Sequence, residues 1–272
     1  MKKYLCLLIL ILTLLGLSAC EIAEDDKVAL AAKSGTASAE LTKKYADELG
    51  LDVDYYEDSP LMYQAVMNGT NPACFEDRNV IGWAIKKEGL ALKTVGDIEN
   101  SSEYAMAVKK GSNAELLAMF NTGLANIRAS GEYDSILNKY GFEDTDYKNP
   151  DAPRTESGVV PEKKYIIYSD NSFAPFVFLD TETKEYIGID MELIAAIARD
   201  QGFEYEMHND GFESAVNAVK SGQADAVIAG MSVEEERKND FDFSDGYFED
   251  GQIMVVPIGS NLTSIEELAE RE

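Results

Sequence analysis

The sequence is poor in positive charge, cysteine and histidine, and each shortage excludes a class of function. Only 24 residues are Lys or Arg, against 50 Asp or Glu, which gives a formal net charge of −26. A chain of this charge cannot neutralise phosphate groups, so nucleic acid is excluded as a partner. Three cysteines and one histidine, His208, form no zinc-ligand pattern. We therefore expect neither a metal nor a cofactor.

Long apolar runs are also absent, apart from one at the start of the chain. Two lysines precede the apolar residues 4–17, and the sequence LSAC follows at 17–20. The run is too short to span a bilayer comfortably, and small residues end it, as in a secretory signal peptide. The four residues LSAC resemble a bacterial lipobox, in which the cysteine is acylated and becomes the mature N-terminus. We predict a lipoprotein signal peptide over 1–19 and an extracytoplasmic protein that Cys20 anchors to the cell membrane. The alternative is an ordinary secretory peptide with an incidental cysteine.

The mature chain would be still more acidic and would contain a single free thiol. Without residues 1–19 it has 22 basic and 50 acidic residues. This composition suits a self-repelling protein held at a membrane by lipid rather than by a basic patch. Cys6 leaves with the signal peptide and Cys20 carries the lipid, so Cys74 has no disulfide partner. A lone cysteine in an apolar strand is more often a small core residue than a reactive one.

Short apolar segments alternate with helical patterns in two blocks. The pattern predicts strands near 28–32, 52–56, 73–76, 104–108, 165–169, 204–208, 226–229 and 252–257, and helices near 39–49, 60–67, 80–87, 114–130, 132–140, 190–201, 212–221 and 233–239. Between the blocks, residues 143–163 carry three prolines, many charges and almost no apolar periodicity, which indicates a linker. Alternating strands and helices favour an α/β fold with largely parallel sheets.

Unusual polar residues follow several of the predicted strands. They lie at 33–36, at 76–77, at 170–173, and at 230–232 with Arg237 shortly after. In parallel α/β sheets, ligands bind at the loops that leave the carboxyl ends of the strands, and helix N-termini there offer N–H donors. These four loops are therefore the candidate binding loops.

The same loops carry a resemblance to a known family. The segments YSDNSFAPFVF, YIGIDMELIAAIA and GFESAVNAVKSGQADAVIAGMSVEEERKNDFDFSDGYF resemble the first lobe of solute-binding proteins of polar-amino-acid ABC transporters. The segments KVALAAKSGTASAEL, VMNGTNPACFEDRNVIGWAI and YAMAVKKGSNAELLAMFNTGLANIRASGEYDSILNKYG resemble the second lobe and the helices that return to the first. The resemblance covers nearly all of the mature chain except the linker.

The resemblance implies a two-lobe type II periplasmic-binding-protein fold, with α/β/α lobes, a hinge of two strands at 104–108 and 252–257, and a ligand held between the lobes. In the usual order lobe 1 comes first, so this chain reads as a circular permutant. The implied divisions are lobe 2 over 27–105, a hinge strand and returning helices over 106–142, the linker over 143–163, lobe 1 over 164–258, and a segment returning to lobe 2 over 259–272. The competing account is a remnant of a tandem receptor whose cleft forms between two chains.

The resemblance also implies a role for each candidate residue. Arg237 would form a bidentate pair with an amino acid's α-carboxylate, and Asp77 would accept from its ammonium. Phe173 and Phe212 would sandwich the side chain of the ligand. The remaining contacts would be hydrogen bonds from Ser232, Thr36 and the carbonyl of Gly230, and contacts to the polar end of the ligand from Asp170, Lys33 and Glu76. Ala37 and the run Asn71-Pro72-Ala73 depart from the family's pattern, which weakens the inference for lobe 2.

Each role has a structural alternative. Arg237 could pair with Glu234 or Asp240 at the surface, and Asp77 could cap the following helix. The two phenylalanines could belong to the core, and Lys33 and Glu76 could be solvated rim residues.

The expected function is a lipid-anchored protein that captures a polar amino acid for an ABC permease by hinge closure. It is not expected to be an enzyme. Two rival functions are an enzyme on the same fold, such as a dehydratase with Glu76 as general acid, and a degenerate receptor that signals or has lost its ligand.

Overall fold

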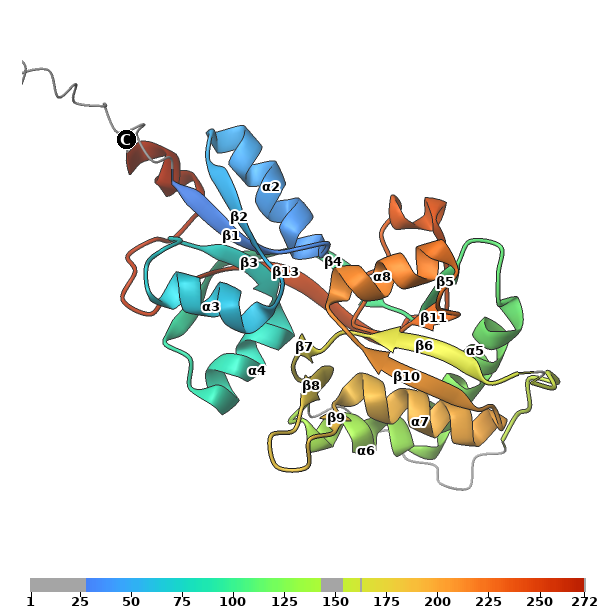
Figure 1. Ribbon diagram of the computed structural model, residues 1–272. Helices are drawn as coiled ribbons and strands as arrows, with labels where there is room; N and C mark the ends of the chain where they lie inside the picture. The colour runs from blue at the N-terminus through green and yellow to red at the C-terminus, as the bar shows by residue number, and fades with distance from the viewer. Residues whose placement is uncertain (1–27, 143–153, 162, 272) are drawn as a thin grey trace, which may run out of the picture.

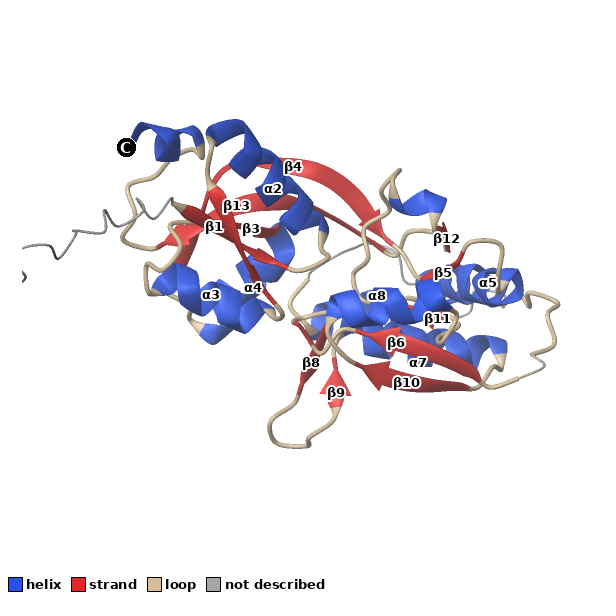
Figure 2. Cartoon of the chain, turned by 45° about the horizontal axis from the view of Figure 1, so that its top comes forward, coloured by secondary structure: helices blue, strands red, loops and turns tan. Residues whose placement is uncertain are grey.

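The computed structural model describes residues 28–142, 154–161 and 163–271, and it contains two five-stranded sheets, each flanked by helices. Figures 1 and 2 show these sheets in two lobes that lie side by side. The predicted signal peptide, Cys20 and most of the predicted linker lie outside the described residues. Within the described part of the chain, no helix is both long and apolar enough to cross a membrane.

Lobe 2 has a sheet with the strand order β2-β1-β3-β13-β4. Strands β1 and β2 are parallel, as are β1 and β3, whereas β13 runs antiparallel to both of its neighbours. The elements are β1 (Ala29–Lys33), α2 (Ala37–Leu49), β2 (Asp52–Tyr56), α3 (Ser59–Met67), β3 (Cys74–Asp77), α4 (Arg78–Glu88), β4 (Leu92–Tyr104), β13 (Phe248–Pro257) and the 3-10 helix η2 (Glu266–Arg271).

Lobe 1 repeats this arrangement with the order β10-β6-β11-β5-β12. Its antiparallel strand is β5, which pairs with β11 and β12. The elements are β5 (Ala107–Lys109), α5 (Ala114–Ser130), α6 (Glu132–Lys139), β6 (Tyr165–Ser169), α7 (Ile189–Gln201), β10 (Tyr205–Asn209), α8 (Phe212–Ser221), β11 (Ala226–Val227), the 3-10 helix η1 (Arg237–Asn239), β12 (Phe241–Phe243), and a small sheet of β7 (Ser172–Phe173), β8 (Val177–Leu179) and β9 (Tyr186–Ile187). The predicted α/β fold class with two sheets is confirmed.

Local sequence explains where the helix that follows β1 begins and ends. The hydroxyl of Thr36 accepts a hydrogen bond from the N–H of Ala39 at 3.1 Å, which caps the first turn of α2. Gly50 ends the helix in the left-handed conformation, with φ of 73°, which glycine adopts without strain. Because α2 starts directly after β1, its N-terminus lies at the carboxyl edge of the sheet, where the candidate site is found.

Two connections cross between the lobes, from β4 to β5 and from β12 to β13. They run together, because Tyr104 pairs with Phe248 and the N–H of Tyr247 donates to the carbonyl of Tyr104 at 2.8 Å. We expected one continuous strand at 104–108, but the chain is divided there between the two sheets. We also expected 252–257 to be the other hinge strand. Those residues lie inside the sheet of lobe 2, because β13 pairs with both β3 and β4.

Two further expectations from the sequence were incomplete. The helix predicted near 233–239 is a single 3-10 turn, Arg237–Asn239. All of β4 except Tyr104 was missed, because its sequence LKTVGDIENSSEY is polar and its strand structure depends on pairing with β13.

The C-terminal segment packs on lobe 2 without a covalent link to the adjacent strand β1. Leu262, Ile265 and Leu268 are buried in one apolar cluster with Leu41 and Phe75. In Figure 1 this segment lies beside α2. Both sheets therefore form within a single chain.

Candidate functional site

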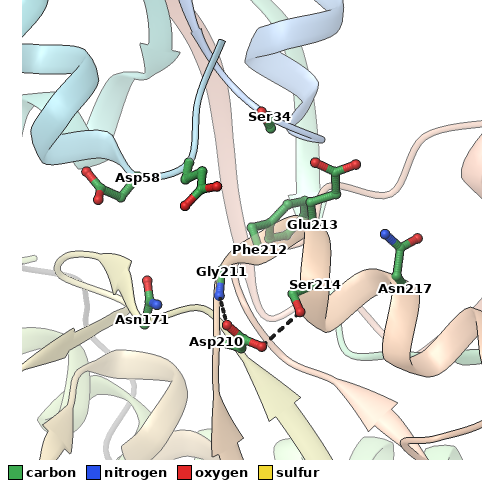
Figure 3. Close-up of a pocket in the computed structure, with 10 residues that line it drawn as sticks. Ser34, Asp58, Asn171, Asp210, Gly211, Phe212, Glu213, Ser214 and Asn217 are labelled. Atoms are coloured by element: carbon green, nitrogen blue, oxygen red, sulfur yellow. Dashed lines mark hydrogen bonds between the residues drawn. The ribbon is translucent and has the colours of Figure 1, made fainter.

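A cavity of about 490 Å³ lies between the two lobes. Figure 3 shows Ser34 and Asp58 facing it from lobe 2, and Asn171 and the start of α8 facing it from lobe 1. The carboxylate of Asp210 accepts hydrogen bonds from the N–H of Gly211 and the hydroxyl of Ser214, which orders that loop. The full lining consists of Ser34, Glu57, Asp58, Asn171, Asp210, Gly211, Phe212, Glu213, Ser214 and Asn217.

A buried ion pair joins the lobes beside this cavity. The Nζ of Lys33, at the end of β1, lies 2.5 Å from the Oδ2 of Asp170, which follows β6. The two side chains are only 3% and 1% exposed. Asp170 also accepts from the N–H groups of Asn171 and Ser172, and Lys33 donates to the carbonyl of Ser172. The solvated-rim alternative for Lys33 is wrong, because a charge this deeply buried requires a partner.

Arg237 lies at the same interface, and its guanidinium is bound by protein groups in this structure. Its Nε is 3.3 Å from a carboxylate oxygen of Glu234, which is the pairing considered as an alternative from sequence. Its guanidinium also donates to the carbonyl of Ser232 at 3.2 Å and, across the lobes, to that of Gly35 at 3.3 Å. It lies over the ring of Phe212, 5.8 Å from the centroid. The arginine fork is therefore held facing lobe 2.

Two consecutive carboxyl groups end β3 in the interior. Glu76 accepts from the hydroxyl of Tyr63 at 2.7 Å and from the N–H of Asp77 at 2.9 Å. Burial, followed by the charge of Asp77, raises the pKa of Glu76 to about 7. Glu76 is thus an interior group and not a solvated rim residue.

Asp77 is also buried and precedes helix α4, but its side chain makes no capping hydrogen bond. Its Oδ1 accepts instead from the amide of Gln252 at 2.7 Å. Burial raises the pKa of Asp77, whereas hydrogen bonds from Gln252 and Tyr104 and the charges of Arg237 and Lys33 oppose that rise. The two cations therefore act on Asp77 electrostatically from the interface.

The loop after β11 is shaped by its glycine. Gly230 has φ of 56°, and a Cβ there would lie 2.3 Å from the Cε1 of Phe173. Its N–H donates to the Oδ2 of Asp190 at 2.9 Å and to the hydroxyl of Tyr247 at 3.0 Å. Ser232 is buried next to it and bridges to Tyr104. Hydrogen bonds to Asp190 and Tyr247 and the bridge to Tyr104 thus fix the backbone of this loop.

The remaining candidates have protein partners as well. The hydroxyl of Thr36 donates to the carbonyl of Lys33 at 2.8 Å while it caps α2. Phe173 and Phe212 are each 5% exposed and belong to different core clusters of lobe 1. The Nζ of Lys33 lies 5.5 Å from the centroid of Phe173. Both rings therefore contribute to the core and also contact an interlobar cation.

Five of the ten candidates meet at the interface between the lobes, namely Lys33, Asp170, Phe173, Phe212 and Arg237, and of the ten only Phe212 lines the cavity. The cavity also contains residues that the sequence analysis missed. Asp58 and Asp210 line the cavity after β2 and β10, and the carboxyl-end rule that selected the other loops applies to them too. Gln252 was overlooked, although an amide directly before the apolar run IMVVP, in the same predicted strand, is a signal. Among the described residues, no group of three His, Cys, Asp or Glu could hold a metal ion.

Comparison with known proteins identifies a class for part of the chain. Residues 165–267 match the family of bacterial extracellular solute-binding proteins, family 3, and the resemblance found in the sequence is confirmed. A probable histidine-binding protein of Neisseria gonorrhoeae is 36% identical over 108 residues, which are 40% of each chain. The arginine-binding extracellular protein ArtP of Bacillus subtilis is 35% identical over 114 residues, 42% of this chain and 43% of that protein.

The matched segments span well under half the length of these curated relatives. Among solved structures, the second substrate-binding domain of a putative amino acid ABC transporter from Streptococcus pneumoniae is 62% identical over 31% of this chain and 38% of that chain, with a TM-score of 0.31. The substrate-binding domain 2 of Lactococcus lactis GlnP is 47% identical over 29% and 34%, with a TM-score of 0.29.

Proposed function

We propose that this protein binds a polar amino acid between its lobes and delivers it to an ABC importer. The observation that carries the proposal is the meeting of opposite charges from both lobes at one interface, the buried pair of Lys33 with Asp170 and the partly buried Arg237 near the buried Asp77. A zwitterion needs an anion and a cation at a short separation, and buried charges are retained where they have such partners. On binding, Arg237 would exchange Glu234 for the α-carboxylate, and Asp77 would accept from the ammonium.

The proposed ligand has an uncharged, amide-bearing side chain. Lys33 and Asp170 neutralise each other, so a charged side chain would leave one of the three charges without a partner. An amide can donate to Asp170 and accept from Lys33 at the same time. The other proposed contacts remain Phe173, Phe212, Ser232, Thr36 and the carbonyl of Gly230. Glu76 is bound by Tyr63 inside lobe 2, and we assign it no catalytic role.

The proposed mechanism is closure about the two crossing connections. Lys33 and Arg237 make their interlobar contacts only when the lobes meet, so a ligand that adds contacts to both lobes would favour the closed state. We propose that one chain forms the cleft as a circular permutant, with the domain ranges given above except that β13 belongs to lobe 2. Acylation of Cys20 would hold the protein at the outer face of the cell membrane.

The proposal is tested by thermal shift with the twenty common amino acids on residues 21–272, followed by calorimetry on Arg237→Ala. Loss of one partner of a buried, hydrogen-bonded charge pair costs about 2–5 kcal/mol in binding, so affinity should fall by more than tenfold. The melting temperature should hardly change, because the partly exposed pair with Glu234 contributes at most about 1 kcal/mol. Lys238→Ala, at an exposed neighbour, is the control. The proposal fails if no amino acid binds, or if Arg237→Ala binds as tightly as the wild type.

A further inference from the structure

Gln252 is a buried amide in the middle of the lobe 2 sheet. It lies on β13, opposite Asp77 of β3 on one side and Glu99 of β4 on the other. The residue is 1% exposed, and its Nε2 donates to the Oδ1 of Asp77 at 2.7 Å. No donor in the described part of the chain reaches its Oε1, which is also buried. One half of the amide is thus satisfied and the other half is not.

The chemistry of Asp77 explains this orientation. An ionised carboxylate can only accept hydrogen bonds, so the amide must turn its NH₂ group toward Asp77 and its oxygen away. A buried acceptor without a partner is unfavourable, and an apolar residue would suit the neighbouring run Ile253–Val256, which is buried throughout. Packing therefore does not account for an amide at this position, whereas a bond to a buried carboxylate does.

The groups around Asp77 have opposite effects on its ionisation. Burial and the neighbouring carboxyl of Glu76 disfavour ionisation, whereas Gln252 and the hydroxyl of Tyr104 favour it. Gln252 and Tyr104 lie on β13 and β4, the two strands that lead to the crossings between the lobes. The charged and titratable groups acting on Asp77 come from β1, β3, β4, β13 and the loop around η1 and are Lys33, Glu76, Tyr104, Asp250, Glu234 and Arg237.

We propose that Gln252 is a positioning residue of the ammonium site, which holds Asp77 ionised and aimed at the interface through its Nε2–H. This inference rests on the proposed function, because it assigns Asp77 to the ligand's ammonium. Gln252 does not contact the ligand. It acts through Asp77, and it connects recognition of the ammonium to β13, the strand that leads from the crossing into the sheet of lobe 2.

The first experiment needs no ligand. The carboxyl carbon of Asp77 is titrated by NMR in the wild type, Gln252→Leu and Gln252→Met, with Asp77→Asn to assign the signal. Without the amide donor the pKa of Asp77 should rise, because a hydrogen bond to the charged form is lost. Gln223→Leu, the same change at an exposed glutamine, should leave it unmoved. An unchanged titration in both position-252 variants overturns the proposal.

The second experiment measures affinity for L-glutamine by calorimetry between pH 5 and 8. Loss of a hydrogen bond to a charged group should weaken binding by about tenfold to a hundredfold. Acid should weaken binding at a higher pH in Gln252→Leu than in the wild type, since protonated Asp77 cannot hold an ammonium. In an Asp77→Asn background, Gln252→Leu should have no further effect.

The outcomes separate this inference from the proposed function. Equal losses with and without the Asp77→Asn substitution would show a general structural effect and overturn the role of Gln252. If L-glutamine does not bind the wild type, the amide-ligand proposal fails, and the titration still decides the role of Gln252. If Gln252→Leu does not fold, Gln252→Met supplies both measurements.

Discussion

The buried pair between Lys33 and Asp170 predicts that one substitution opens the unliganded protein without unfolding it. Lys33→Met leaves Asp170 with only the N–H groups of Asn171 and Ser172. Asp170 is 1% exposed while the lobes meet, so its charge would be buried and unpaired there. If the lobes separate, water can solvate it. Lys33→Met should therefore destabilise the closed arrangement of the lobes and leave the folding of each lobe unaffected.

The magnitude follows from the burial of both partners. Removing one member of a buried ion pair costs about 3–5 kcal/mol, and about 1.4 kcal/mol changes an equilibrium tenfold. The ratio of closed to open molecules should fall by roughly a hundredfold to several thousandfold in Lys33→Met. The double variant Lys33→Met/Asp170→Asn carries neither charge and should recover much of the closed population.

The only tryptophan of the chain provides the assay. Trp83, on α4 of lobe 2, contacts the ring of Phe178 on β8 of lobe 1, with 5.6 Å between centroids. Opening should separate the rings, shift the tryptophan emission and increase the radius of gyration measured by small-angle X-ray scattering. Lys43→Met, which breaks an exposed pair with Asp47 on α2, should do neither. Unchanged emission and scattering in Lys33→Met would refute the reasoning.

Two further predictions concern the binding loops. Gly230→Ala places a Cβ at positive φ against Phe173, so the melting temperature and the affinity for an amino acid should both fall. The control Gly82→Ala, in an open position on α4, should be neutral or stabilising by up to about 1 kcal/mol. Equal behaviour of the two variants would contradict this explanation. Glu76 has a pKa of about 7 in the fold against 4.5 ordinarily, so its contribution to stability is fully present below about pH 4.5 and is lost as the pH rises toward 7. Urea unfolding should show a smaller loss of stability from pH 5 to 7.5 in Glu76→Gln than in the wild type. Parallel curves of stability against pH would argue against a buried Glu76 carboxyl with a raised pKa.

Periodicity and turn residues predicted most elements because those elements bury one face against their own sheet. The helix at 212–221 and the strands at 52–56 and 165–169 were placed at their observed bounds. The polar strand β4 was missed, since its pairing with β13 involves residues more than a hundred positions away. The local sequence of β4 therefore does not predict its partner strand.

Loop position predicted which residues belong to the candidate site, but it did not predict which of them bind one another. The carboxyl-end rule selected Lys33 and Asp170 as residues that face a ligand, whereas the structure pairs them with each other across the lobes. Arg237 was similarly selected for an anion and is held by Glu234. Residue types indicate which charges are present, and only the folded geometry decides which of them neutralise one another.

The position of β13 has a consequence for how the protein is made. This strand lies between β3 and β4, and its residues leave the ribosome long after both of them. Lobe 2, whose strands begin first, is therefore completed last, and β5 of lobe 1 pairs with β11 and β12, which are made more than a hundred residues later. Pairings over such separations fold slowly. Translation must pass Phe243 before the sheet of lobe 1 can be finished, and Pro257 before that of lobe 2 can be finished.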